Sequence, residues 1–163
     1  MLTSADTVFH VLALLASLGC GLNGGIFFAF SVVVMRALAE RPVPEGIAVM
    51  QCINVVVLNR WFLGVFFGTG ALCLAAIILA VVSWGDPRSA WLLAGSVLYL
   101  VGTILVTMRF NVPRNEALRR VARSSAEAVS LWADYLATWT AWKHVRAAAA
   151  FLASACFGIG LNA

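Results

Sequence analysis

The chain has 163 residues, of which 63% are hydrophobic and only 11% charged, and its formal net charge is +4. Soluble globular domains are about half apolar and a quarter charged, so this composition argues against a soluble domain and predicts an integral membrane protein. The few cations are needed at the bilayer surface, so we expect the lipid bilayer as a partner and no nucleic acid.

Four apolar runs are long enough to cross the membrane as helices, since about 20 residues span the hydrocarbon core of about 30 Å. They cover residues 8–34, 61–83, 90–108 and 145–162. Lipid offers no partner to an exposed strand edge, so we expect an all-α fold. The predicted architecture is a four-transmembrane-helix bundle that forms a single integral membrane domain over residues 1–163, with cytoplasmic connections at 35–60 and 109–144.

The basic residues predict the orientation of these spans. Arg36, Arg41 and Arg60 flank the first connection, seven of the eleven cations lie between residues 109 and 146, and only Arg88 lies between the second and third spans. The positive-inside rule therefore places both basic connections in the cytoplasm and both termini outside. We expect a bacterial inner (plasma) membrane as the location, and a homo-oligomer is compatible with this arrangement.

The first span is expected to be retained, because the residues before it contain no Lys or Arg and its apolar run exceeds the 7–15 residues or so of a signal peptide. Gly21 and Gly25 are four residues apart, as are Gly64 and Gly68 in the second span. This spacing favours close helix approach, and it predicts that the first two helices contact each other along these faces.

The connection between residues 35 and 60 is predicted to contain a short helix. Two prolines in ERPVPEG (40–46) end the first helix, and the apolar run IAVMQCINVVVLN (47–59) is too short to span, which favours an interfacial or re-entrant helix. Gln51, Asn54 and Asn59 either line a polar pocket at the cytoplasmic mouth or satisfy backbone and headgroup partners.

Pro113 is predicted to end the third span, because its ring removes a donor and the residue before it avoids helical angles. Beyond it, apolar residues recur at spacings of three and four from Leu118 to Trp142. This period predicts an additional amphipathic helix on the cytoplasmic side that leads into, or is continuous with, the last span.

Metal chemistry is not expected, because a catalytic metal needs about three ligands and the chain has only two histidines. His10 lies near the outer face and His144 near the inner one, and no carboxylate lies within the four spans. There is also no glycine-rich nucleotide loop. The sequence therefore predicts no metal and no cofactor.

The side chains best able to bind a ligand lie between residues 109 and 146. His144 stands between Lys143 and Arg146; these cations either extend to lipid phosphates or belong to a site. The aromatic residues nearby exceed what an interfacial belt needs, and such rings can stack on a flat ligand; they are Trp132, Tyr135, Trp139 and Trp142. Asn111 and Asn115 can each cap a helix, but two caps here are uneconomical, which leaves one amide for a substrate oxygen.

Two segments of this region resemble a known family. NVPRNEAL (111–118) and WADYLATWTAWKHVR (132–146) are similar to the paired signatures of small membrane proteins related to anthrone oxygenases, many of them catalogued as a domain of unknown function. GGIFFAFSVVVMRAL (24–38) and LNRWFLGVFFGTG (58–70) also resemble the family's first loop and second span. The resemblance covers nearly the whole chain.

The resemblance implies oxidation of anthrones, or of other planar aromatic substrates, by molecular oxygen without a dedicated cofactor. The matching positions are Asn111, Pro113, Asn115, Trp139, His144 and Arg146. The family usually has asparagine immediately before the histidine, whereas this chain has Lys143.

An anthrone carries an acidic C–H bond, and its carbanion reacts directly with oxygen, so the protein need supply only a base and oxyanion stabilisation. We assign His144 as the base and Lys143 and Arg146 as the groups that hold the oxyanion. The substrate-binding residues we expect are Asn111, Asn115, Trp139, Trp142 and Asn59. The alternative is a non-catalytic membrane scaffold or accessory protein, in which the same residues only anchor helices. An enzyme should bring Asn111, Asn115, His144 and Arg146 to one enclosed pocket.

Overall fold

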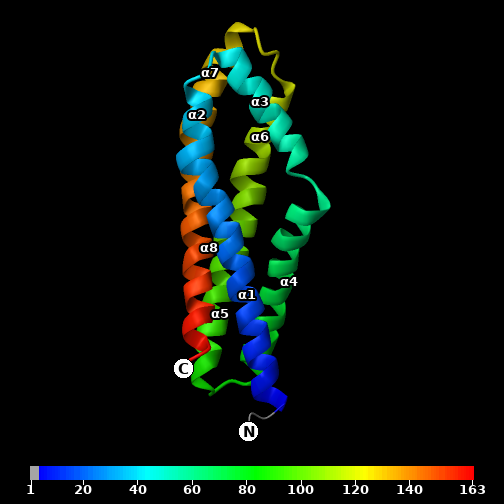
Figure 1. The fold of residues 1–163 in the computed structure, drawn as a ribbon, viewed down its shortest axis with the longest axis vertical. Helices are drawn as coiled ribbons and strands as arrows, with labels where there is room; N and C mark the ends of the chain where they lie inside the picture. Colours follow the sequence, from blue (N-terminus) through cyan, green and yellow to red (C-terminus); the bar gives the residue numbers. More distant parts are fainter. Residues whose placement is uncertain (1–3) are drawn as a thin grey trace.

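The computed structural model describes residues 4–163, and its regular structure is entirely helical over that range (Figure 1). Several of the helices contain short π-helical segments, denoted η. The helical segments in chain order are α1 (Ser4–Ala29), η1 (Phe30–Val34), α2 (Met35–Ala39), α3 (Val43–Val56), α4 (Arg60–Val82), α5 (Pro87–Tyr99), η2 (Leu100–Leu105), η3 (Thr107–Asn111), α6 (Val112–Arg120), α7 (Ala126–Asp134), η4 (Tyr135–Trp139) and α8 (Thr140–Gly160).

The long helices run side by side along one axis (Figure 1). Helix α8 packs against α1 and α5, and α4 packs against α5 and α1. Both termini lie at one end of the molecule, which we call the terminal end. Helices α2, α3 and α7 gather at the opposite end, which we call the inner end (Figure 1).

Three continuous helices are long and apolar enough to cross a membrane: Asp6–Ala39, Arg60–Val82 and Pro87–Arg120. They contain or closely match the first three predicted spans. The fourth predicted span, 145–162, corresponds to α8, which is not among them, so the four-span count stays a prediction. The connection predicted at 109–144 does end in a helix continuous with α8, since α7, η4 and α8 follow one another without a break.

The helix starts follow from local side-chain chemistry. The Asn59 side chain accepts hydrogen bonds from the backbone N–H groups of Trp61 and Phe62, each at 3.0 Å, and so caps α4. Asp86 accepts from the backbone N–H of Arg88 at 2.9 Å and caps α5, which has a proline in its first turn. Gly85, with φ +108°, provides the left-handed residue that the turn between α4 and α5 requires.

The prediction that Pro113 ends the third span is wrong. The helix continues from Pro87 to Arg120, and the break falls at residues 121–125 instead. The π-helical segment η3 ends two residues before Pro113. Irregular turns of this kind let a helix accommodate the proline ring and the missing donor. The predicted amphipathic helix is consequently divided into α6 and α7.

The predicted glycine contact between the first two spans is also wrong in its register. A side chain at Gly25, Gly64 or Gly68 would meet nothing within 4 Å. The close approach occurs at Gly19, where a Cβ atom would collide with Thr69 of α4. Gly21 instead faces α8, at Ser154. Helices α1 and α4 do contact each other, but the contact is made at Gly19 and Thr69 and not along the predicted glycine pairs.

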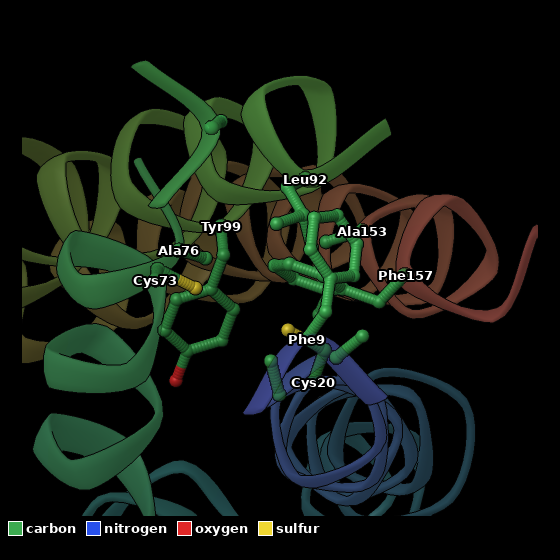
Figure 2. Close-up of a cluster of buried hydrophobic side chains, with 12 residues drawn as sticks. Phe9, Cys20, Cys73, Ala76, Leu92, Tyr99, Ala153 and Phe157 are labelled. Atoms are coloured by element: carbon green, nitrogen blue, oxygen red, sulfur yellow. The ribbon is translucent and has the colours of Figure 1, made fainter. Parts of the chain in front are cut away.

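Buried apolar side chains form one core along the long helices and another at the inner end. Figure 2 shows the first, in which Phe9 and Cys20 of α1 meet Leu92 and Tyr99 of α5 together with side chains of α4 and α8. The second joins α2 and α3 to α6, α7 and η4 around Met50, Leu118, Trp132 and Tyr135. A third, smaller cluster consists of Phe27, Phe66 and Ala147, and its Phe66 also lines the pocket described below.

Candidate functional site

A partly enclosed pocket of about 190 Å³ lies toward the inner end of the molecule. Its wall comes from α1, η1, α3, α4, η3, α6, η4 and α8, so it collects side chains from almost the whole chain. The lining is mainly apolar and aromatic, with a few polar groups: Asn54, Thr107, Asn111, Asn115, Lys143 and Arg146. We call this the inner-end pocket.

Three of the four π-helical segments contribute to the wall of this pocket. Phe30 comes from η1, Met108 and Asn111 come from η3, and Trp139 comes from η4. A π-helical turn holds an extra residue and so changes the direction of the side chains that follow it. Such turns occur frequently at functional sites.

Two buried cations, Lys143 and Arg146, stand side by side on α8 and line the pocket. Their relative exposures are 7% and 4%. Among residues 4–163, the ion pairs involve Arg88, Arg119 and Arg120, so no described carboxylate neutralises either cation. Burying a charge without an opposite partner costs about 3–5 kcal/mol of folding free energy, so two such side chains in one pocket are unusual.

Both cations contact aromatic rings: Lys143 contacts three rings and Arg146 contacts one. The Lys143 Nζ atom lies 4.8 Å from the ring centroid of Phe27, 4.7 Å from that of Phe30 and 4.6 Å from that of Trp139. The Arg146 guanidinium carbon lies 3.9 Å from the centroid of Phe27. Ring faces attract cations, so they offset part of the cost of burial.

Lys143 precedes the predicted fourth span, and its environment favours the neutral amine. Burial, and then the nearby guanidinium of Arg146, lower the pKa of Lys143 well below its ordinary value. Arginine does not lose its proton in proteins. The lysine is therefore the member of the pair that can give up its charge.

A hydrogen-bond network fixes the aromatic wall. The Asn115 Oδ1 atom accepts from the Tyr135 hydroxyl and from Trp139 Nε1, both at 2.7 Å. The Asn54 amide donates to the Tyr135 hydroxyl at 3.5 Å. Burial raises the pKa of the Tyr135 phenol, so it remains a neutral donor. The Asn115 oxygen is thus fully engaged by the protein.

Asn111 differs from Asn115 in having an oxygen without a partner. Its amide nitrogen donates to the Trp139 carbonyl at 3.3 Å, while its Oδ1 atom is buried and makes no hydrogen bond. It makes no capping bond to α6. Arg146 Nε is a second buried atom without a partner. The two pocket residues thus offer one acceptor, Asn111 Oδ1, and one donor, Arg146 Nε–H, that make no hydrogen bond within the protein.

The structure brings five of the predicted site residues to this pocket and leaves three outside it. Asn111, Asn115, Trp139, Lys143 and Arg146 line it. The roles assigned to them remain predictions.

His144, Trp142 and Asn59 do not line the pocket. His144 is exposed on α8. Trp142 stacks on Phe110, with ring centroids 3.7 Å apart, and Asn59 is exposed and caps α4. Lys143 and Arg146 therefore lie on the buried face of α8, whereas His144 lies on its exposed face.

Sequence reasoning missed the phenylalanines of this site, of which Phe27 and Phe30 lie beside the cations and Phe62 and Phe66 line the pocket. Phe27 and Phe30 are three residues apart, and Phe62 and Phe66 are four apart, so each pair lies on one helix face. Within an apolar span this pattern looks the same as a lipid-facing surface. Only the folded structure shows that Phe27 and Phe30 lie against the cations of α8 and that Phe62 and Phe66 line the pocket.

Metal binding has no obvious site in residues 4–163. No group of three or more His, Cys, Asp or Glu side chains in that range is arranged to hold a metal ion.

The fold and the pocket define a helical protein that has three helices long and apolar enough to span a membrane and an aromatic, cation-lined cavity at one end. Residues 60–156 match the sequence model of the family described as anthrone oxygenase. The match covers more than half of the chain, which therefore belongs to the anthrone oxygenase family. The matched range includes every polar residue of the pocket from Asn111 to Arg146, whereas Phe27 and Phe30 precede it. No curated protein and no solved structure gives a significant match to this chain.

Proposed function

We propose that this protein is a cofactor-independent membrane oxygenase that converts anthrone-like planar aromatic substrates to quinones with molecular oxygen. The observation that carries this proposal is the pair of buried cations, Lys143 and Arg146, which no described carboxylate neutralises and which face an aromatic pocket. Such a site suits a flat ligand that becomes an anion during the reaction. Membership of the anthrone oxygenase family supports the same class of chemistry.

In this proposal Lys143 replaces His144 as the base, because Lys143 lines the pocket and His144 does not. The neutral amine removes a proton from the acidic C–H of the anthrone, and the electron pair of that bond passes into the ring system as an enolate. The resulting ammonium is held by the rings of Phe27, Phe30 and Trp139.

Oxygen completes the reaction without another reactant. The carbanion carbon is oxidised and forms a bond to one oxygen atom, which gives a peroxide that takes up a proton. Loss of water from this C–H hydroperoxide breaks the O–O bond and leaves the second carbonyl. One anthrone and one O₂ thus give one anthraquinone and one H₂O.

The remaining polar groups suit the substrate's oxygens. Arg146, with an unbonded Nε–H, stabilises the enolate oxygen, and Asn111 Oδ1 accepts from a ring hydroxyl. An engineered apolar cavity of about 150 Å³ holds benzene, so 190 Å³ accommodates somewhat more than one ring. The rest of a three-ring substrate extends into the open side of the pocket.

A non-catalytic accessory protein is the alternative. The engaged oxygen of Asn115 and the positions of His144, Trp142 and Asn59 outside the pocket favour it. In that case the pocket binds a flat aromatic molecule without turnover.

The test is aerobic incubation of the protein in lipid nanodiscs with 1,8-dihydroxyanthrone and related anthrones. Oxygen uptake and quinone absorbance are followed together, and the spontaneous oxidation in protein-free nanodiscs is subtracted. We expect one O₂ per quinone and retention of activity after dialysis against a metal chelator.

Substitutions at two adjacent residues, Lys143 and His144, show which side chain is the base. Lys143→Met should lower the protein-dependent rate by about 10²–10⁴, and His144→Ala should leave it within about twofold of wild type. Binding of the quinone with no protein-dependent rate would establish the accessory alternative. Loss of activity in His144→Ala alone would return the base to the histidine.

A further inference from the structure

Part of the lining of the inner-end pocket is apolar and also exposed on the outer surface of the molecule. Four of its lining residues are strongly exposed: Leu58 (66%), Phe67 (56%), Met108 (63%) and Val112 (50%). They come from the turn between α3 and α4, from α4, from η3 and from the start of α6. We call this group the lateral portal.

If the candidate spans cross the bilayer, the lateral portal lies at a depth where the protein surface faces hydrocarbon. Helix α4 begins at Arg60, which stacks on the exposed ring of Trp61 at 5.0 Å, and this pair is typical of the headgroup level. Phe67 lies seven residues further along, which is about 10 Å at a rise of 1.5 Å per residue. Met108 ends the third predicted span. The opening therefore reaches from the interface into the acyl-chain region.

A second opening joins the same pocket and has a different character. An adjoining cavity shares Asn54, Val57, Leu58, Val112 and Asn115 with the pocket and adds Gln51, Val55, Glu116 and Arg119. Leu58 and Val112 thus border both openings, whereas Phe67 and Met108 belong to the lateral portal alone. We call this the polar mouth. Its rim is held by an ion pair between Arg119 and Glu116 at 2.7 Å and by a hydrogen bond from Arg123 to Gln51 at 2.8 Å.

We propose that the planar substrate enters from the bilayer through the lateral portal and not from water through the polar mouth. The proposal rests on the proposed function for the class of molecule that enters. A flat apolar ring is concentrated in lipid, and moving it from acyl chains onto an apolar wall exposes none of its surface to water. Passage through the polar mouth would require hydration of the ring and displacement of paired polar groups.

Three matched tryptophan substitutions of exposed apolar residues test the route in nanodiscs. Met108→Trp narrows the lateral portal, Val55→Trp narrows the polar mouth, and Val101→Trp lies on η2 away from both openings. We expect Met108→Trp to lower kcat/KM for 1,8-dihydroxyanthrone at least fivefold with kcat little changed. The other two variants should stay within twofold of wild type. A loss of kcat/KM in Val55→Trp with none in Met108→Trp would overturn the proposal.

A second measurement needs no turnover, so it separates failure of the route from failure of the proposed function. Nanodiscs that contain a phospholipid with a diazirine in its acyl chain are irradiated, and the labelled peptides are identified by mass spectrometry. An open portal predicts adducts on the pocket residues Phe66 and Thr107 in wild type and fewer in Met108→Trp. Adducts confined to outward-facing residues such as Leu74 and Val101 would show that lipid does not reach the pocket.

Discussion

Each end of the molecule places an arginine over a phenylalanine ring, but carboxylates neutralise only the arginine at the terminal end. At the terminal end, the Arg88 guanidinium lies 4.2 Å from the ring centroid of Phe9 and pairs with Asp86 at 2.6 Å and Asp6 at 3.0 Å. At the inner end, Arg146 lies 3.9 Å from the centroid of Phe27, and no described carboxylate pairs with it.

The difference separates a structural charge from a functional one. Arg88 ties α1 to the turn between α4 and α5 and needs nothing further. Arg146 adds a cost to the folded state, as does Lys143 whenever it is charged, and such costs are typical of a site that must meet a charged ligand or transition state. Substitutions of Lys143 or Arg146 should therefore lower activity, whereas a substitution of Arg88 should lower stability.

The largest effect is expected at Lys143. As a base, Lys143 acts only when neutral, so activity should rise with pH through its pKa. Because burial and Arg146 lower that pKa, the rise should lie well below the pH of about 10.4 at which an ordinary lysine titrates. Lys143→Met should lose this pH dependence together with about 10²–10⁴ in rate. A pH–rate profile from pH 5 to 10 measures both, and an identical profile in the variant would contradict the role.

Arg146→Met should lower kcat by about 10²–10³, the usual effect of losing one donor to a developing oxyanion. Stability should stay the same or increase, because the substitution removes a buried charge without a partner. Thermal unfolding in detergent, measured beside kcat, gives both values. If activity and stability fell together, Arg146 would be a structural residue like Arg88.

Arg88→Met should give the opposite result. Removing the guanidinium breaks its ion pairs with Asp6 and Asp86, and because these side chains are only partly buried, stability should fall by about 1 kcal/mol. The rate per folded molecule should not change. A lower unfolding temperature with normal kcat confirms the comparison, whereas a lower kcat in correctly folded protein would connect the two ends.

The smallest expected effect concerns acid. The hydrogen bonds from the Arg88 side chain and then from its backbone lower the pKa of Asp86 below its unfolded value of about 3.9. The stabilisation is therefore complete above that pH and is lost as the pH falls through the lower folded value. Between pH 5 and 3, wild type should lose slightly more stability than Asp86→Asn, which keeps the helix cap. Equal losses would mean that the ion pair contributes nothing.

The helical fold could be predicted from the sequence because apolar length is a local property. The residues of each of the first three spans identify that span without knowledge of its neighbours. Helix α8 is different, because Lys143, His144 and Arg146 interrupt its apolar composition. Its position between α1 and α5 depends on contacts such as the pairing of the Ser17 and Ser154 hydroxyls at 3.1 Å, which no local pattern reveals.

The candidate site was partly predictable for the same reason. One segment contains Asn111, Asn115, Trp139, Lys143 and Arg146, and this concentration of polar, aromatic and basic side chains predicts a site there. Which of two adjacent residues faces the pocket was not predictable, since Lys143 and His144 differ by about 100° around α8. Phe27 and Phe30 could not be assigned either, because they come from the other end of the chain.

The π-helical segment η3 makes the pocket depend on chain length as well as on residue type. Each residue advances a helix by about 100°, so one residue added or removed between Thr107 and Phe110 would rotate everything that follows. Asn111 and Asn115 would then point toward lipid or toward a neighbouring helix, although the amino acids themselves were unchanged. Inserting or deleting a single residue in this segment would therefore remove both asparagine side chains from the pocket, with the same effect as replacing them.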